Sequence, residues 1–195
     1  MEAASVADND RDGILDLTYC VYNSILKRME IFRSKGESDW SFQQGKLSFA
    51  VLEESHPVVT LWTPDINRDG VPDLILNLGK PQNLLLVAFG NKDSEVWSKD
   101  FRMQNPIDVS DPENLQLTDV NGDGVNDLVL LNDRTKSIQL YIGRTNGTFM
   151  PSSRLAKAEG VAGFAITDIN ADLIPELILT ESIDGSLRII SLKEE

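Results

Sequence analysis

Short apolar runs separated by polar turns make up this chain. Four of them follow directly on acidic segments and are typical of β-strands: residues 17–21, 74–77, 128–131 and 177–180. Strand-like runs also lead into three of the acidic segments, at residues 58–62, 115–118 and 164–167. The pattern therefore predicts β-hairpins with an acidic segment at each tip.

A third strand is expected after a polar turn in each repeat, over residues 29–32, 84–89, 138–142 and 187–192. In the first three repeats a glycine-containing turn and aromatic residues come next. We expect these aromatic residues to open a fourth strand and to pack between neighbouring sheets: Trp40, Phe42, Trp97 and Phe149.

The strand pattern recurs about every 50 residues, in approximate repeats 3–57, 58–111, 112–160 and 161–195 of a single repeat domain. One four-stranded sheet cannot bury its faces alone and must stack on neighbours. The predicted fold class is all-β, a β-propeller or partial propeller of about four four-stranded blades with the acidic loops at hairpin tips. Because the last repeat has only three predicted strands, we expect a fragment of a longer propeller, or an array completed by further blades or another copy.

The acidic segments are four versions of one nonapeptide. They read DNDRDGILD, DINRDGVPD, DVNGDGVND and DINADLIPE, and they begin at Asp8, Asp65, Asp119 and Asp168. Asp, Asn or Glu stands at positions 1, 3, 5 and 9 of each copy, and glycine stands at position 6 of the first three. The spacing supplies side-chain oxygens, while the glycine permits a sharp turn with positive φ.

This donor set favours Ca²⁺, which accepts about 6 to 8 oxygen ligands in flexible geometry. Zn²⁺ prefers Cys and His, and the chain has one of each. The candidate ligands of the first three loops are Asp8, Asp10, Asp12 and Asp16; Asp65, Asn67, Asp69 and Asp73; and Asp119, Asn121, Asp123 and Asp127. Each loop also offers the backbone carbonyl at position 7, which belongs to Ile14, Val71, Val125 and Ile174 in the four copies.

A single nonapeptide is equally typical of an acidic surface turn, because Asp, Asn and Gly favour turns. Four copies, each followed by Leu and an apolar run, favour metal binding instead. An EF-hand loop is excluded, because that loop needs a bidentate Glu at position 12. Position 12 is Tyr19, Leu76, Leu130 and Leu179 in the four copies.

The fourth copy departs from the pattern, with Leu173 in place of the glycine and Glu176 in place of the last Asp. Leucine disfavours a positive φ, at a cost on the order of 1 kcal/mol or more. Three good calcium sites are therefore expected, and a doubtful fourth formed by Asp168, Asn170, Asp172 and Glu176.

The motif DxNxDGxxDL resembles the FG-GAP and VCBS repeats, which are calcium-loop blades of integrin α-subunit head domains and of many secreted or surface-anchored bacterial proteins. The resemblance extends from Asp8 to about Leu192, and the FG-GAP half of the motif is represented loosely by Phe89-Gly90 and Ile142-Gly143. It implies calcium hairpins at the rim of one propeller face. It also implies an extracellular or cell-surface location and a recognition or adhesion role toward a protein or glycan ligand.

Charge agrees with this interpretation. The net charge is −13, and the four loops alone carry 13 carboxylates. Such acidity counts against nucleic acid, whose phosphates call for Lys and Arg patches. No stretch approaches the roughly 20 apolar residues of a membrane span, and we expect no signal peptide in the residues given before Asp8.

Residues that would indicate catalysis are few. His56 is the single histidine and lies in an expected surface loop, and Cys20 is expected to be a small buried residue of a strand. The main hypothesis is therefore a non-enzymatic recognition module, with contacts from loops 92–99 and 105–112. Trp40, Trp62 and Trp97 are candidate sugar-stacking residues, although we expect at least two of them to pack between blades. The alternatives are a fragment of a propeller enzyme acting on polysaccharide, as a lyase or hydrolase, and a structural spacer.

Overall fold

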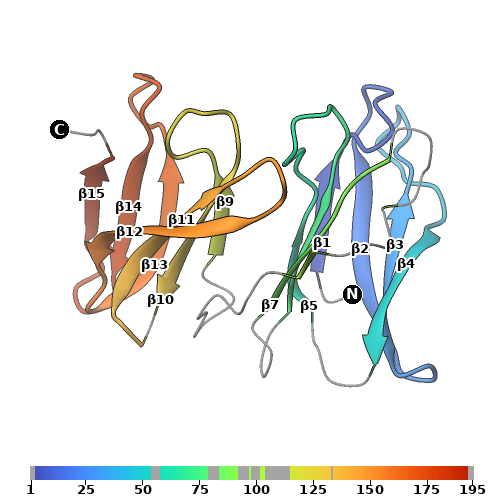
Figure 1. Ribbon diagram of the computed structural model, residues 1–195, viewed down its shortest axis with the longest axis horizontal. Coiled ribbons are helices and arrows are strands. Elements are labelled where there is room, and N and C mark those ends of the chain that lie inside the picture. The colour runs from blue at the N-terminus through green and yellow to red at the C-terminus, as the bar shows by residue number, and fades with distance from the viewer. Residues whose placement is uncertain are drawn as a thin grey trace. The chain divides into compact units, whose positions relative to one another are not determined.

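The described residues of the chain form four antiparallel β-sheets built from fifteen strands (Figure 1). The computed structural model describes residues 3–53, 58–78, 84–91, 97, 102–103, 115–132 and 134–192. No helix occurs in those ranges, and accordingly no helix able to cross a membrane was found there. The all-β class predicted from the sequence is confirmed.

Each sheet consists of strands that follow one another along the chain. The first contains β1 (Ala3–Ala7), β2 (Asp16–Asn23), β3 (Arg28–Ser34) and β4 (Lys46–Glu53). The second contains β5 (Val58–Trp62), β6 (Leu74–Leu78), β7 (Leu84–Ala88) and β8 (Arg102–Met103). The third contains β9 (Leu115–Thr118), β10 (Asp127–Asn132), β11 (Ser137–Gly143) and β12 (Phe149–Lys157), and the three-stranded fourth contains β13 (Val161–Thr167), β14 (Glu176–Glu181) and β15 (Leu187–Ser191).

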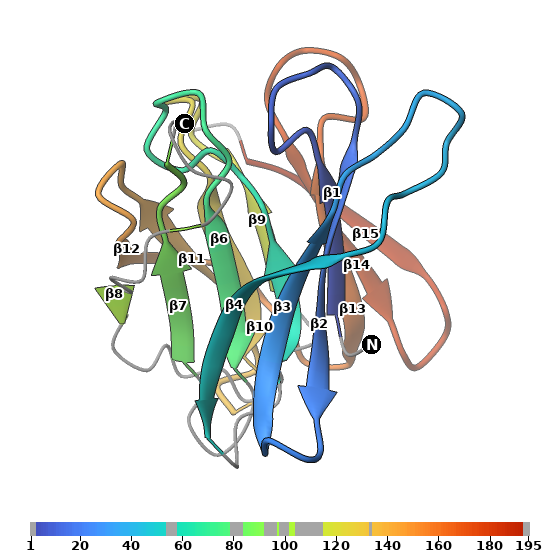
Figure 2. The same ribbon diagram turned by 90° about the vertical axis from the view of Figure 1, so that its right-hand side faces the viewer.

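The chain divides into two compact units, residues 1–107 and 108–195. In the first unit, two acidic loops join β1 to β2 and β5 to β6, and in the second they join β9 to β10 and β13 to β14. Within each unit the two loops lie at the same end of the sheets (Figures 1 and 2). The hairpins expected around the acidic segments are therefore present.

The core of the first unit lies between its two sheets. Cys20, Met29 and Ile31 of the first sheet pack with Leu61, Leu74, Leu76, Leu78 and Leu86 of the second, together with Trp97. Cys20 is fully buried, as expected from its place in a strand. Successive side chains of a strand point to opposite faces of the sheet. In β2, Asp16, Thr18 and Cys20 therefore face inward, and the residues between them are only partly buried.

The second unit is built in the same way. Val129, Leu131, Ile138 and Leu140 of the third sheet pack with Ile166, Leu177 and Leu179 of the fourth. β10 is apolar along most of its length, and all six of its residues are buried. Burial of apolar surface between stacked sheets is the main favourable term in the stability of each unit.

Two of the four aromatic residues expected to pack between sheets do not do so. Trp40 and Phe42 lie in the loop between β3 and β4, and their exposed fractions are 89% and 45%. An isolated bridge between Gly36 and Phe42 closes this loop, so β4 begins only at Lys46. Phe149 does open β12 and is buried, and Trp97 is buried outside the strands.

Each acidic loop contains two residues with positive φ. At position 6, Gly13, Gly70, Gly124 and Leu173 have φ values of 86°, 80°, 82° and 69°. At position 4, Arg11, Arg68, Gly122 and Ala171 have φ values of 61°, 61°, 75° and 61°. The leucine of the fourth copy therefore adopts the same turn as the glycines, despite its unfavourable backbone preference.

A second glycine anchors each of the first three hairpins to the strand that follows. Gly36, Gly90 and Gly143 lie at or just after the end of the third strand, against position 8 of the acidic loop. A Cβ atom there would come within 2.1, 2.5 and 2.0 Å of the carbonyl oxygens of Leu15, Pro72 and Asn126, respectively. Only glycine allows the backbone to approach this closely.

We expect Gly143→Ala to lower the free energy of unfolding by about 2 to 4 kcal/mol, because its new methyl group meets backbone that has no room to move. The matched control is Gly122→Ala, which adds a methyl group at a position with φ +75° where nothing lies within 4 Å. Arg11, Arg68 and Ala171 occupy the corresponding position, so this change should cost no more than about 1 kcal/mol. Urea denaturation of both variants followed by circular dichroism checks the ranking, and equal losses would contradict it.

Candidate metal-binding loops

The aspartate at position 1 organises each acidic loop. Its carboxylate accepts hydrogen bonds from at least two backbone N–H groups further along the loop, one of them at position 6, with distances of 2.7 to 3.3 Å. In the first loop the donors are Asp12 and Gly13, which face Asp8. The positive φ at position 6 turns that N–H toward the carboxylate, so backbone conformation and side-chain chemistry depend on each other.

The side chains at positions 3 and 5 also accept hydrogen bonds from the backbone of the loop. Together with the contacts of position 1, these form what we call the hydrogen-bond frame. The oxygen at position 3 accepts from the N–H of position 5 at 2.8 to 3.3 Å in all four loops. The carboxylate at position 5 accepts from the N–H of position 7 at 2.8 to 2.9 Å. These short-range Asx-type contacts hold the side-chain oxygens on the inner side of the turn.

The carboxylate at position 9 is buried in the first three loops. Asp16, Asp73 and Asp127 are each 0% exposed, and all three accept from the N–H of position 2 at 2.9 to 3.0 Å. Their second oxygen accepts from the N–H of Gly36, Gly90 or Gly143 at 2.8 to 3.0 Å. Each of these aspartates therefore ties the loop to the end of the third strand.

In the fourth loop, Glu176 makes only the first of these two contacts. It accepts from the N–H of Ile169 at 3.0 Å, and its other oxygen accepts from Asn170 Nδ2 at 3.0 Å. The strand position occupied elsewhere by glycine is Leu192, whose N–H donates to the carbonyl of Pro175 at 3.3 Å. The carboxylate of the fourth loop is thus bound within its own loop, and the link to the third strand runs through a backbone carbonyl instead.

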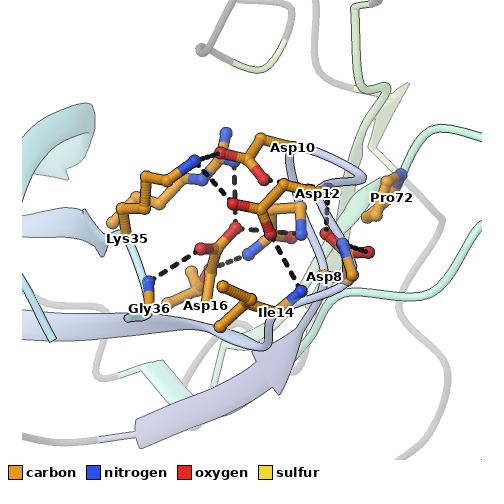
Figure 3. A network of polar contacts seen from close by, with 12 residues as sticks. Asp8, Asp10, Asp12, Ile14, Asp16, Lys35, Gly36 and Pro72 are labelled. Atoms are coloured by element: carbon orange, nitrogen blue, oxygen red, sulfur yellow. Dashed lines mark hydrogen bonds and ion pairs between the residues drawn. The ribbon is translucent and has the colours of Figure 1, made fainter. Parts of the chain in front are cut away.

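Three candidate ligand oxygens converge in the first loop. Asp8, Asp10 and Asp16 each offer a carboxylate oxygen, and these atoms all lie within 4.8 Å of one another. Figure 3 shows these three side chains and Asp12 gathered at the tip of the hairpin. This convergence is the arrangement that a cation held by side-chain oxygens requires.

Burial changes the acidity of the position 9 carboxylates. It raises the pKa of Asp73 to about 6, against the opposing effect of the hydrogen bonds from Gly90 and Ile66. Burial likewise raises the pKa of Asp127, and the carboxylates of Asp123 and Asp119 add to the rise. A cation among these oxygens would favour their charged forms.

Two basic side chains reach the first loop from the end of the third strand. Lys35 Nζ lies 2.5 Å from Asp10 Oδ2 and 2.7 Å from Asp12 Oδ2 (Figure 3). Arg33 Nη2 lies 3.1 Å from the buried Asp16 Oδ2. The hydrogen bond from Lys35 lowers the pKa of Asp12, and the two carboxylates raise the pKa of Lys35.

The donor chemistry of the first loop fits a hard cation, because its three converging side chains all offer carboxylate oxygens. The candidate ligands at positions 1, 3, 5 and 9 lie together within each hairpin tip, held by the hydrogen bonds described above. Ligation by the carbonyl oxygens of Ile14, Val71, Val125 and Ile174 stays a prediction, as does the number of occupied sites.

The three tryptophans have different environments. Trp97 is buried and its Nε1 donates to the Pro72 carbonyl at 3.1 Å, and Trp62 is partly buried. Trp40 is held with φ +68° beside an open depression of about 530 Å³ whose lining includes Ile14 and Phe42. Trp40 is thus the candidate sugar-stacking residue that is accessible.

Some residues singled out from the sequence lie outside the described part of the chain. They are His56 and, apart from Trp97, the loops 92–99 and 105–112. The contacts proposed for those two loops therefore stay a prediction.

Sequence reasoning missed the two basic side chains and the contact of the second glycine with the acidic loop. Lys35 and Arg33 lie about 20 residues after the loop that they contact, and nothing in the nonapeptide indicates them. A signal was present for the glycine, because Gly36, Gly90 and Gly143 each follow position 9 by 16 to 20 residues.

Comparison with known families gives a match over part of the chain. Residues 119–179, which include the third and fourth acidic loops, match the model of the FG-GAP-like repeat. No curated protein matches the chain. The chain therefore carries an FG-GAP-like repeat over residues 119–179, and this is the family that its acidic nonapeptides predicted.

Proposed function

We propose that this chain is a calcium-binding FG-GAP-type module that serves recognition or adhesion at the cell surface or outside the cell. The observation that carries the calcium assignment is the repeated hydrogen-bond frame, which holds side-chain oxygens at the tips of four hairpins. The match to the FG-GAP-like repeat supports it.

Calcium would act here by neutralising crowded carboxylates. The first loop places four aspartates in nine residues, and the second and third place three each. Ca²⁺ bound at positions 1, 3, 5 and 9 would remove their mutual repulsion and offset the cost of burying Asp73 and Asp127 in charged form. A ligand that binds only the folded state also raises stability by mass action.

The stacked sheets are proposed to be blades of a propeller. The fourth sheet has exposed apolar residues on β15, where Leu187 is 64% and Ile189 is 54% exposed. Isolated sheets of this kind gain stability when a neighbour covers them. This supports completion by further blades or by another copy of the chain.

A protein or glycan is the proposed ligand, and the loop between β3 and β4 is the proposed contact. Trp40 offers a nearly free indole, and Ser38, Ser41 and Glu37 beside it offer polar groups. An aromatic face flanked by hydroxyl and carboxylate groups is suited to a sugar ring, which has an apolar face and a polar edge.

Calcium addition to chelator-treated protein should release or absorb heat in calorimetry and raise the melting temperature.

We expect Asp123→Asn to lower the affinity of the third loop by at least about tenfold, because a charged ligand is lost while the acceptor for the Val125 N–H is kept. Asp184→Asn removes the same charge from an exposed turn and is the matched control. Absence of calcium uptake would refute the metal assignment.

Trp40→Ala should weaken binding on a glycan array by about tenfold or more, because a well-placed aromatic contact contributes about 1.4 kcal/mol or more. Ile183→Ala is the control, since Ile183 is also 90% exposed but lies in the other unit. Circular dichroism should show both variants folded. Undiminished binding by Trp40→Ala would remove this loop from the ligand site.

A further inference from the structure

Lys35 occupies a place in the first hairpin that has no basic counterpart in the others. It follows β3 directly and stands opposite Asp16, because Leu17 pairs with Ser34 in the strand register. The corresponding residues are Phe89, Ile142 and Ser191, as the registers of the other sheets show. None of these three side chains carries a charge.

The first loop also has an additional carboxylate. Position 3 is Asp10 in this loop, whereas it is Asn67, Asn121 and Asn170 in the other three. Lys35 Nζ contacts that additional carboxylate at 2.5 Å and also contacts Asp12 at 2.7 Å. The positive charge of Lys35 therefore balances the extra negative charge.

The two contacted oxygens belong to candidate calcium ligands. A Ca²⁺ ion that uses Asp10 and Asp12 must compete with the ammonium for them or share them with it, and two cations close together repel. The ion pairs are partly exposed, with side-chain exposures of 43% for Lys35, 26% for Asp10 and 31% for Asp12. Such pairs are weak enough to be displaced, but their displacement lowers the affinity for the ion.

We propose that Lys35 is a tethered cation that orders the first loop without metal and makes it the weakest calcium site of the first three. This inference rests on the proposed calcium function. It assigns the loops different roles: the second and third would respond at low calcium concentrations, and the first would respond only at higher ones.

The test follows each loop separately by nuclear magnetic resonance of the whole chain. The amide signals of Gly13, Gly70 and Gly124 report the first, second and third loops, because each N–H donates to the position 1 carboxylate of its own loop. In the natural sequence, the Gly13 signal should change at a higher calcium concentration than the other two.

Lys35→Gln should lower the calcium midpoint of Gly13 by about tenfold and leave those of Gly70 and Gly124 unchanged. Lys35→Arg keeps the charge and should stay within about threefold of the natural sequence. Lys27→Gln removes the same charge from the turn at the far end of the β2–β3 hairpin and should change none of the midpoints. Asp10→Asn combined with Lys35→Gln gives the first loop the ligand types of the second and tests the idea if Lys35→Gln alone fails to fold.

An unchanged or raised Gly13 midpoint in Lys35→Gln would overturn the inference. If that variant does not fold, the double variant decides, because its first loop has the ligand types of the second: a Gly13 midpoint that stays above those of Gly70 and Gly124 would overturn the inference. The proposed calcium function would survive that result if Gly70 and Gly124 still responded to calcium. If none of the three glycine signals responded, the calcium function itself would fall, so the two failures are distinguishable.

Discussion

The buried carboxylate at position 9 is the interaction on which each of the first three hairpins depends. It accepts one N–H from the start of its own loop and another from the glycine at the end of the third strand. Charged acceptors form stronger hydrogen bonds than neutral ones, and a buried charge without partners is costly. This single group therefore fixes the shape of the loop and its place on the sheet together.

That constraint explains why the loops need a counter-charge. Holding the position 9 carboxylate in the interior raises the pKa of Asp73 and Asp127, which means that the fold disfavours their charged forms. In the first loop, Arg33 contacts Asp16, and Lys35 contacts the outer carboxylates. In the first loop, basic side chains thus supply a counter-charge of the kind that the proposed metal ion would supply.

The sequence predicted the hairpins well because strand period and turn chemistry are local properties. Alternating or apolar runs beside Asp, Asn and Gly specify a strand, a tip and a second strand without reference to distant residues. The prediction that Trp40 packs between sheets is wrong. The bridge between Gly36 and Phe42 closes a loop that contains Trp40, so β4 begins only after this residue. The contact of Lys35 could not be predicted, because strand register, rather than proximity in sequence, brings this residue to the loop.

The fourth loop shows which part of the motif defines the fold. It lacks the glycine at position 6, yet Leu173 has φ +69° and donates to Asp168 at 2.8 Å, as the glycines do in their loops. The hydrogen-bond frame therefore tolerates loss of that glycine. The change that matters more is at position 9, where Glu176 is bound to Asn170 instead of the third strand. The carboxylate of the fourth loop therefore lacks the link to the third strand that the buried aspartates make in the other three loops.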